Sequence, residues 1–245
     1  MTSYHGISSS PIPFKNIARG PDFTRVVGDI HGKIGSYYQI VNSTNTPLDS
    51  PSIQLGDFCY GFEESLNEKM EHVWKNHSSH HKFIRGNHDN PEKCKSSPAY
   101  LGDFFYDESK KLFGVSGAYS TDVDTRSPFI NWWPNEELTT TEMNKAYELY
   151  DEKRPAVMIS HDAPTSITKG YVGEYEYHIK TSTREFLQAL LDLHSPRLWI
   201  HGHWHFNRFT EAKGCLFVSL EELGFIDVNW REDYFITSKK QKIKY

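Results

Sequence analysis

Five short stretches of the chain end in clusters of aspartate, asparagine or histidine, and these side chains are the ones best suited to chemistry. Their carboxylate oxygens, amide oxygen and imidazole nitrogens form a ligand set that suits Mn, Fe, Co, Ni or Zn ions. No cysteine belongs to this set, which argues against a site for softer metals. The set consists of Asp29, His31, Asp57, Asn87, His88, Asp89, His161, His203 and His205.

The spacing within two of these stretches is as informative as the residue types. Asp29 and His31 lie two positions apart in the chain, as do His203 and His205. In an extended strand, side chains at positions i and i+2 point to the same side. Each pair is therefore predicted to face one metal centre together.

Apolar residues run directly into each polar cluster, which predicts buried strands that end in functional turns. Helical segments lie between them, so the chain is predicted to form an α/β layered fold that binds its ligands beyond the carboxyl ends of the strands. The units of strand and turn are predicted at 24–32, 52–58, 82–89, 156–164 and 197–205. The helices are predicted at 33–43, 63–77, 139–153 and 182–193, with Thr139 or Thr140 capping the third and Ser182 or Thr183 the fourth.

The ends of the chain follow other patterns. Residues 1–22 are rich in Ser, Pro and Gly and predict an extended leader, whereas 23–245 is predicted to be one domain. Alternating residues at 215–238 predict antiparallel strands that finish a second sheet. The stretch from 94 to 135 is irregular and gives no clear assignment.

Composition argues against several classes of protein. The 27 Lys and Arg against 32 Asp and Glu give a net charge of −5, so no broad basic surface is available for nucleic acid. Aromatic residues make up 14% of the chain, which argues against disorder, and no apolar run approaches the roughly 20 residues of a membrane helix. Three cysteines without a CxxC motif, and a start without an apolar signal segment, favour a reduced cytoplasmic protein.

The polar clusters also match a known order of motifs. They read GDIH at 28–31, GD at 56–57, GNHD at 86–89, SHDAP at 160–164 and GHWH at 202–205. In this order the chain resembles the calcineurin-like metallophosphoesterase superfamily, and its small bacterial and phage members most. The resemblance implies a sandwich of two mixed β-sheets flanked by α-helices.

The resemblance also implies a site for two divalent metal ions, with Mn²⁺ favoured and Fe, Zn, Co or Ni open. Asp57 would bridge the ions, because a shared carboxylate suits two cations about 3.5 to 4 Å apart. The ligands of the first ion would be Asp29, His31, Asp57 and His205, and those of the second Asp57, Asn87, His161 and His203.

The same resemblance implies that the protein hydrolyses phosphate mono- or diesters. A hydroxide that bridges the metals would attack phosphorus, and His88 would protonate the leaving oxygen. Asp89 would orient His88. We expect the substrate to be a phosphorylated small molecule or a nucleotide.

One motif departs from the relatives that act on phosphoproteins. Protein serine/threonine phosphatases of this superfamily read G-D-x-V-D-R-G, and their arginine holds the phosphate, whereas this chain reads GDFCYGF at 56–62 with Tyr60 and Gly61 at the Asp and Arg positions. Arg126, in the irregular middle, and Arg85, before GNHD, are the candidates for a phosphate contact.

Three alternatives remain beside the small-molecule phosphoesterase. A protein serine/threonine phosphatase is second because the arginine motif is missing, and a nuclease acting on nucleic-acid ends is third because the net charge is negative. A scaffold that keeps the fold without catalysis is the non-enzyme alternative. Every ligand position and His88 are present in this chain, which argues against the scaffold.

Overall fold

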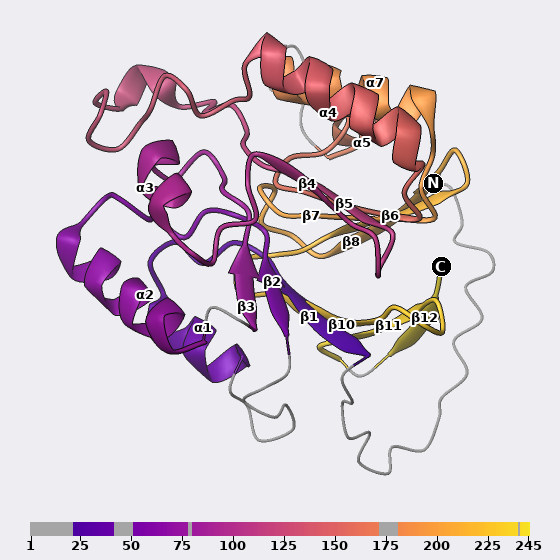
Figure 1. Ribbon diagram of the computed structural model, residues 1–245, viewed down its shortest axis with the longest axis horizontal. Helices are drawn as coiled ribbons and strands as arrows, with labels where there is room; N and C mark the ends of the chain where they lie inside the picture. The colour runs from indigo at the N-terminus through magenta and orange to yellow at the C-terminus, as the bar shows by residue number, and fades with distance from the viewer. Residues whose placement is uncertain (1–21, 42–50, 78–79, 172–180, 240) are drawn as a thin grey trace.

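The computed structural model describes residues 22–41, 51–77, 80–171, 181–239 and 241–245, so all but the last residue of the predicted leader lies outside the described residues. These segments form two six-stranded sheets packed face to face. Figure 1 shows α4, α5 and α7 over the outer face of one sheet and α1 and α2 beside the other. The predicted sandwich of two mixed sheets with flanking helices is confirmed.

The first sheet joins the N-terminal strands to the C-terminal ones. Its order is β12-β11-β10-β1-β2-β3, and β1, β2 and β3 run parallel to one another. Their last residues are in register, Val27 beside Gln54 and Gln54 beside Phe83, so the following loops leave the sheet at one edge. The strands are β1 (Phe23–Val27), β2 (Ser52–Gln54), β3 (His81–Phe83), β10 (Phe225–Asn229), β11 (Tyr234–Thr237) and β12 (Lys242–Lys244).

The second sheet has four parallel strands between two antiparallel edge strands. Its order is β4-β5-β6-β7-β9-β8, and Val115, Ser160, His201 and Ser219 end the four parallel strands at the same level. The strands are β4 (Phe104–Asp107), β5 (Leu112–Val115), β6 (Val157–Ser160), β7 (Leu198–His201), β8 (Arg208–Ala212) and β9 (Cys215–Ser219).

The four predicted helices are present, although residues 42 and 43 of the first lie outside the described residues, and two short helices at 91–96 and 165–168 were not predicted. Thr139 forms a capping box with Glu142 at the start of α4, as expected. The cap of α7 is Thr181, in place of the predicted Ser182 or Thr183, because its extended backbone lets its side chain accept a hydrogen bond from the N–H of Arg184. The helices are α1 (Ile34–Val41), α2 (Glu64–His77), α3 (Pro91–Ser96), α4 (Thr140–Lys153), α5 (Thr165–Thr168) and α7 (Ser182–Leu193), with a 3₁₀ turn η1 (Val123–Thr125).

The described helices include none that combines the length and apolar character needed to cross a bilayer.

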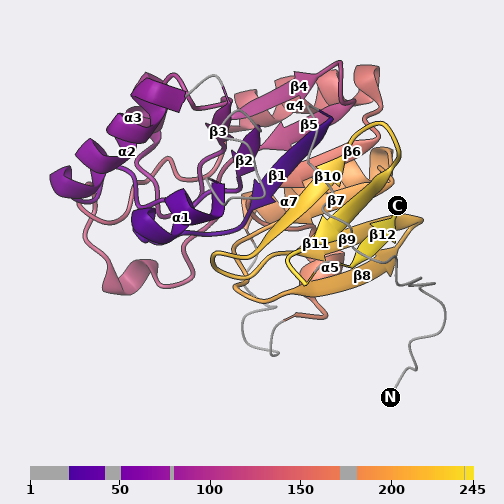
Figure 2. The same cartoon turned by 90° about the horizontal axis from the view of Figure 1, so that it is seen from below.

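The prediction for the C-terminal segment was wrong in its sheet assignment. Only β9 joins the second sheet, where it runs parallel to β7. The strands β10 and β11 pair antiparallel with each other, and β10 pairs with β1 of the first sheet. Figure 2 shows these strands with β12 on the side of β1 away from α1, α2 and α3. Alternation predicts a half-buried strand but carries no information about its partner, which packing decides.

One large apolar cluster lies between the two sheets, and two others lie between each sheet and its helices. Val26, Ile53 and Ile226 of the first sheet pack in one apolar cluster with Ile159 and Ile200 of the second. Burial of this cluster holds the two sets of parallel strands together, so that loops from both sheets can build one site.

Candidate metal centre

Loops at the carboxyl ends of five parallel strands supply the predicted site residues. They follow β1, β2 and β3 in the first sheet and β6 and β7 in the second. The prediction that extended backbone aligns the pairs at i and i+2 was wrong, because His31, His203 and His205 have positive φ angles of 46°, 68° and 51°. These residues lie in tight turns, which orient each side chain individually.

The first donor group contains Asp29, His31, Asp57 and His205, whose ligand atoms lie within 4.8 Å of one another. His205 Nε2 is 2.9 Å from Asp29 Oδ2 and 2.9 Å from His31 Nε2. His31 Nε2 is also 3.7 Å from Asp57 Oδ2. Three loops that are distant in sequence therefore direct two carboxylates and two imidazoles at one point.

The second donor group contains Asp57, His161 and His203, again within 4.8 Å. His161 Nε2 lies 3.3 Å from Asp57 Oδ1 and 3.2 Å from Asn87 Oδ1. Asp57 belongs to both groups, with Oδ2 toward the first and Oδ1 toward the second. His203 and His205 belong to different groups, so the prediction that this pair faces one centre was wrong.

The site carries buried negative charge. Asp29 and Asp57 are 0% and 1% exposed, and neither carboxylate pairs with a lysine or arginine among the described residues. Burial alone would lower the pKa of His161, but the Asp57 and Asp29 carboxylates outweigh it and raise the pKa to about 10. Burial would raise the pKa of Asp29, yet His161, His205 and His31 hold it below its ordinary value. Such a cluster attracts positive charge, so the donor set fits divalent cations.

Two glycines permit the close approach of these side chains. A Cβ atom at Gly86 would lie 2.1 Å from Asp57 Oδ1, and one at Gly56 would lie 2.6 Å from His161 Nδ1. Gly56 also has a φ of +104°, which residues with a side chain rarely adopt. Glycine is therefore required at both positions by space, and at Gly56 by backbone conformation as well.

A chain of hydrogen bonds sets the orientation of the Asn87 amide. The Ser120 hydroxyl donates to Glu136 Oε2 at 2.6 Å, and the Ser120 N–H donates to Glu136 Oε1 at 2.6 Å. With its proton engaged, the Ser120 oxygen accepts from Asn87 Nδ2 at 3.2 Å. The amide oxygen of Asn87 is thereby turned toward His161 and the second donor group.

Asp89 does not contact the His88 ring, so the predicted orienting role is corrected. Its carboxylate accepts the backbone N–H groups of Asp57 and Gly86 at Oδ2 and of Tyr60 at Oδ1, at 2.8 to 3.0 Å. Burial and the charge of Asp57 raise the pKa of Asp89 to about 6. Asp89 ties the loop after β2 to the loop after β3, together with the bond from the His88 N–H to Asp57 Oδ1 at 2.7 Å and the bond from the Asn90 N–H to the Tyr60 carbonyl at 2.7 Å.

Arg126, and not Asp89, contacts His88. Its Nη2 lies 2.8 Å from His88 Nε2, and its Nη1 lies 3.3 Å from His88 Nδ1. Arg126 also donates to both Asp122 oxygens at 2.6 and 2.7 Å and to the Asn131 carbonyl at 3.0 Å. Burial and the Arg126 charge lower the pKa of His88 despite the nearby Asp57 carboxylate.

A cavity of about 260 Å³ opens over both donor groups. His88 lines it together with residues from each group and from the loop that carries Arg126. The lining residues are Asp57, Asn87, His88, Thr121, Asp122, His203, Trp204 and His205.

Arg85 is not among the residues that line this cavity. Its side chain is 2% exposed, and its Nε donates to Asp103 Oδ1 at 2.8 Å while Nη1 donates to the Glu136 carbonyl. The expectation that Arg85 contacts phosphate is therefore corrected. This arginine instead joins the end of β3 to the segments that contain Asp103 and Glu136.

Residues outside the two donor groups support the donors from behind, among them Asp162, whose place after His161 in SHDAP predicts a supporting role and not ligation. Asp162 lies 4.0 Å from His203 Nε2, and it accepts hydrogen bonds from Arg184 Nε at 2.9 Å and Trp204 Nε1 at 3.0 Å. Ser120 and Glu136 support Asn87 in the same way. Arg184 belongs to no motif, so spacing gave no signal for it, whereas Ser120 and Glu136 lie in the stretches GAYS at 117–120 and WWPNEEL at 132–138, which the family resemblance includes.

Comparisons with solved structures give matches at low identity. A predicted phosphoesterase from Streptococcus pneumoniae is 11% identical with a TM-score of 0.42, covering 89% of this chain and 90% of that chain. Phosphopantetheinyl hydrolase from Mycobacterium tuberculosis is 12% identical with a TM-score of 0.46, covering 83% and 91%. An archaeal phosphodiesterase is 14% identical with a TM-score of 0.40, covering 90% and 96%.

A sequence search finds no match among curated proteins. The model of one family, described as calcineurin-like phosphoesterase, matches residues 25–207. This range includes both donor groups, from Asp29 to His205, and spans well over half of the chain. The chain therefore belongs to the calcineurin-like phosphoesterase family and is a metal-dependent hydrolase of phosphoric esters.

Proposed function

We propose that the protein is a dinuclear phosphoesterase, in which residues 23–245 form one catalytic domain. The observation that carries the proposal is the position of Asp57, whose two oxygens face two separate donor groups. A carboxylate shared in this way suits a two-metal site. The first ion would be held by Asp29, His31, Asp57 and His205, and the second by Asp57, Asn87, His161 and His203.

The protein residues would prepare this site for a phosphate ester. Bound cations would lower the pKa of a shared water toward about 7 and withdraw charge from the phosphoryl oxygens. Burial lowers the pKa of His203 to about 4, so its imidazole has no proton to lose, whereas His161, whose pKa is raised to about 10, would release a proton when a cation binds. Asp89 and Ser120 would hold the backbone of Asp57 and the amide of Asn87 in position.

His88 would donate a proton to the leaving oxygen. Its ring lines the cavity and is half-buried, so it can reach a bound ester. Arg126 would bind the phosphate of the substrate by exchanging hydrogen-bond partners, because its N–H groups already contact Asp122, His88 and Asn131. A phosphate would replace the Asp122 carboxylate as the partner of the Arg126 guanidinium and draw that group away from the His88 ring. The positive charge that lowers the pKa of His88 would then be farther from the ring, so the ring would hold a proton more readily.

The cavity volume of about 260 Å³ favours a small phosphomonoester or a nucleotide-type diester as the substrate. A protein phosphatase is second, because Tyr60 at the position of the motif aspartate is buried and donates a hydrogen bond to Glu71. A nuclease acting on nucleic-acid ends is the third alternative. A non-catalytic interaction scaffold is disfavoured because both donor groups are complete. Mn²⁺ is the proposed ion, and the three free cysteines accord with a reduced cytoplasmic location.

The test is a metal-reconstituted assay. The protein is stripped with a chelator, titrated with Mn²⁺ while bound metal is counted, and offered an aryl phosphomonoester, an aryl phosphodiester, nucleotides, phosphopeptides and single-stranded DNA. We expect two ions per chain and hydrolysis only after both bind. Full activity with a single ion, or turnover by the stripped protein, would contradict the dinuclear proposal.

A further inference from the structure

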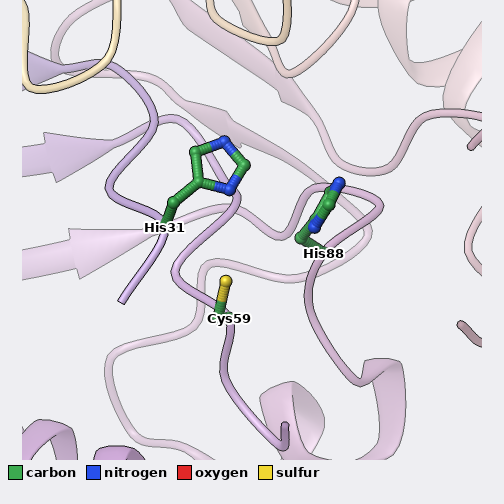
Figure 3. Close-up of side chains that lie close together, drawn as sticks. All are labelled: His31, Cys59 and His88. Carbon is green, nitrogen blue, oxygen red and sulfur yellow. The ribbon is translucent and has the colours of Figure 1, made fainter. Parts of the chain in front are cut away.

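We propose that His31, Cys59 and His88 form a third cation site, suited to a thiophilic divalent ion such as Zn²⁺, and that its occupation inhibits the enzyme. The three residues are half-buried, and their sulfur and nitrogen donors lie within 4.8 Å of one another. Figure 3 shows the Cys59 thiol and the two imidazole rings surrounding one space. The site is thus enclosed by donors and still open to ions from solvent.

The turn after β2 brings the thiol to this position. Cys59 follows Asp57 by two residues and has a φ of 66°, a left-handed conformation that is uncommon for residues other than glycine. The rings of His31 and His88 have centroids 5.0 Å apart and are almost perpendicular, at 84°. The edge of one imidazole ring therefore faces the other ring, and the Cys59 sulfur lies close to both.

The chemistry of these donors differs from that of the two groups above. One thiolate and two imidazoles are preferred ligands of Zn²⁺, whose tetrahedral shell would leave a fourth position for water. The groups that contain Asp57 offer oxygen and nitrogen only, and suit harder ions as well. Binding would release the thiol proton to solvent and form one metal–sulfur bond.

The Arg126 guanidinium faces both ring nitrogens of His88 and must move aside before a cation can bind there. Arg126 lies against the His88 ring, but its guanidinium is paired with both oxygens of Asp122. The carboxylate of Asp57 lies 3.7 Å from His31 Nε2 on the other side. An ion near His31 would therefore sit close to a buried negative charge.

Inhibition follows from the two histidines. His31 belongs to the first donor group, and His88 lines the cavity as the proposed proton donor. An ion that engages both would remove them from catalysis. This consequence rests on the proposed function, whereas binding of the ion does not.

The other cysteines serve as matched controls. Cys94 and Cys215 are 0% and 1% exposed, and neither belongs to a donor group among the described residues. The full-length protein is stripped of metal with a chelator, so that no other ion holds His31, and is titrated with Cd²⁺ while its ultraviolet thiolate-to-metal charge-transfer band is recorded. We expect the band in the wild type and in Cys94→Ser and Cys215→Ser, and its loss in Cys59→Ser and Cys59→Ala. Absence of the band from the wild type, or its persistence in both Cys59 variants, would overturn the site.

Inhibition is measured separately with Zn²⁺ on the same proteins, loaded with Mn²⁺. Loss of the thiol should raise the inhibitory Zn²⁺ concentration at least about tenfold in Cys59→Ser, since even indirect support of a metal contributes that much affinity. Equal inhibition of the wild type and Cys59→Ser would overturn the inhibitory role. A Cd²⁺ band without any Zn²⁺ inhibition would leave the site in place and count against the proposed roles of His31 and His88.

Discussion

Two kinds of buried carboxylate occur in this protein, and their surroundings differ. Asp227 and Asp162 each accept from an arginine Nε at 2.9 Å, in pairs that join separate elements. Asp29 and Asp57 are equally buried, but they meet histidines and backbone N–H groups. The first kind is neutralised within the chain, whereas the second leaves a negative charge that a cation can balance.

The two kinds of carboxylate differ in how the free energy lost on burial is recovered and in what the buried group does. A buried ion loses several kcal/mol of hydration, which the attraction and hydrogen bonds of a paired arginine offset while they join two elements. The pair of Arg25 and Asp227 does this between β1 and β10, where the two residues lie opposite each other. Asp29 and Asp57 are compensated by histidines and backbone N–H groups in place of an arginine, and these are groups that can bind or admit cations, which is why we place the chemistry there.

The sharpest test of this comparison is Asp57→Asn. Removing the shared carboxylate should release both ions, and the loss of several kcal/mol of charge stabilisation corresponds to a decrease in turnover of roughly 10⁴-fold or more. Bound metal is counted by mass spectrometry beside Mn²⁺-dependent turnover. An Asp57→Asn protein that keeps both ions and its turnover would refute the shared-ligand assignment.

The matched variant is Asp227→Asn in the arginine-paired class. Removing one partner of a buried ion pair should lower the free energy of unfolding by about 3 to 5 kcal/mol, as measured by urea denaturation, and leave metal content unchanged. Loss of metal from this variant, or unaltered stability, would show that the two classes of carboxylate are not distinct.

The next prediction concerns His88, which lies beside the metal centre. His88→Asn should keep both ions, because His88 belongs to neither group around Asp57, and slow hydrolysis by roughly 10² to 10⁴-fold. The loss should shrink with an activated aryl leaving group that needs no proton. An equal loss on good and poor leaving groups would remove His88 from the role of general acid.

The smallest expected effect concerns the support of Asn87. Ser120→Ala removes the acceptor that holds Asn87 Nδ2, so the amide can rotate and affinity for the second ion should fall roughly 10- to 100-fold. Calorimetric titration of the stripped protein with Mn²⁺ measures this, with Ser109→Ala on the exposed turn between β4 and β5 as the control. Unchanged affinity for both ions would show that Ser120 does not position Asn87.

Local patterns were sufficient for much of the fold. The five units of strand and turn were predicted because apolar runs ending in Gly and Asp or His are local features, and the α4 cap at Thr139 was predicted for the same reason. The sheet assignment of 215–238 was not, since β10 pairs with β1 at positions about 200 residues away. The roles of Asp89 and Arg85 were corrected by hydrogen bonds that no spacing encodes.

The sequence by itself determined the identities of the donors and the strand ends that carry them, because motif and periodicity act over a few residues. Only the tertiary structure decided which donors come together in one donor group. Asp29 meets His205 across 176 residues, and His203 and His205 separate to different groups although they are two positions apart. Tight turns with positive φ aim each side chain, and packing of two sheets brings the turns together, so neither outcome could be predicted from spacing along the chain.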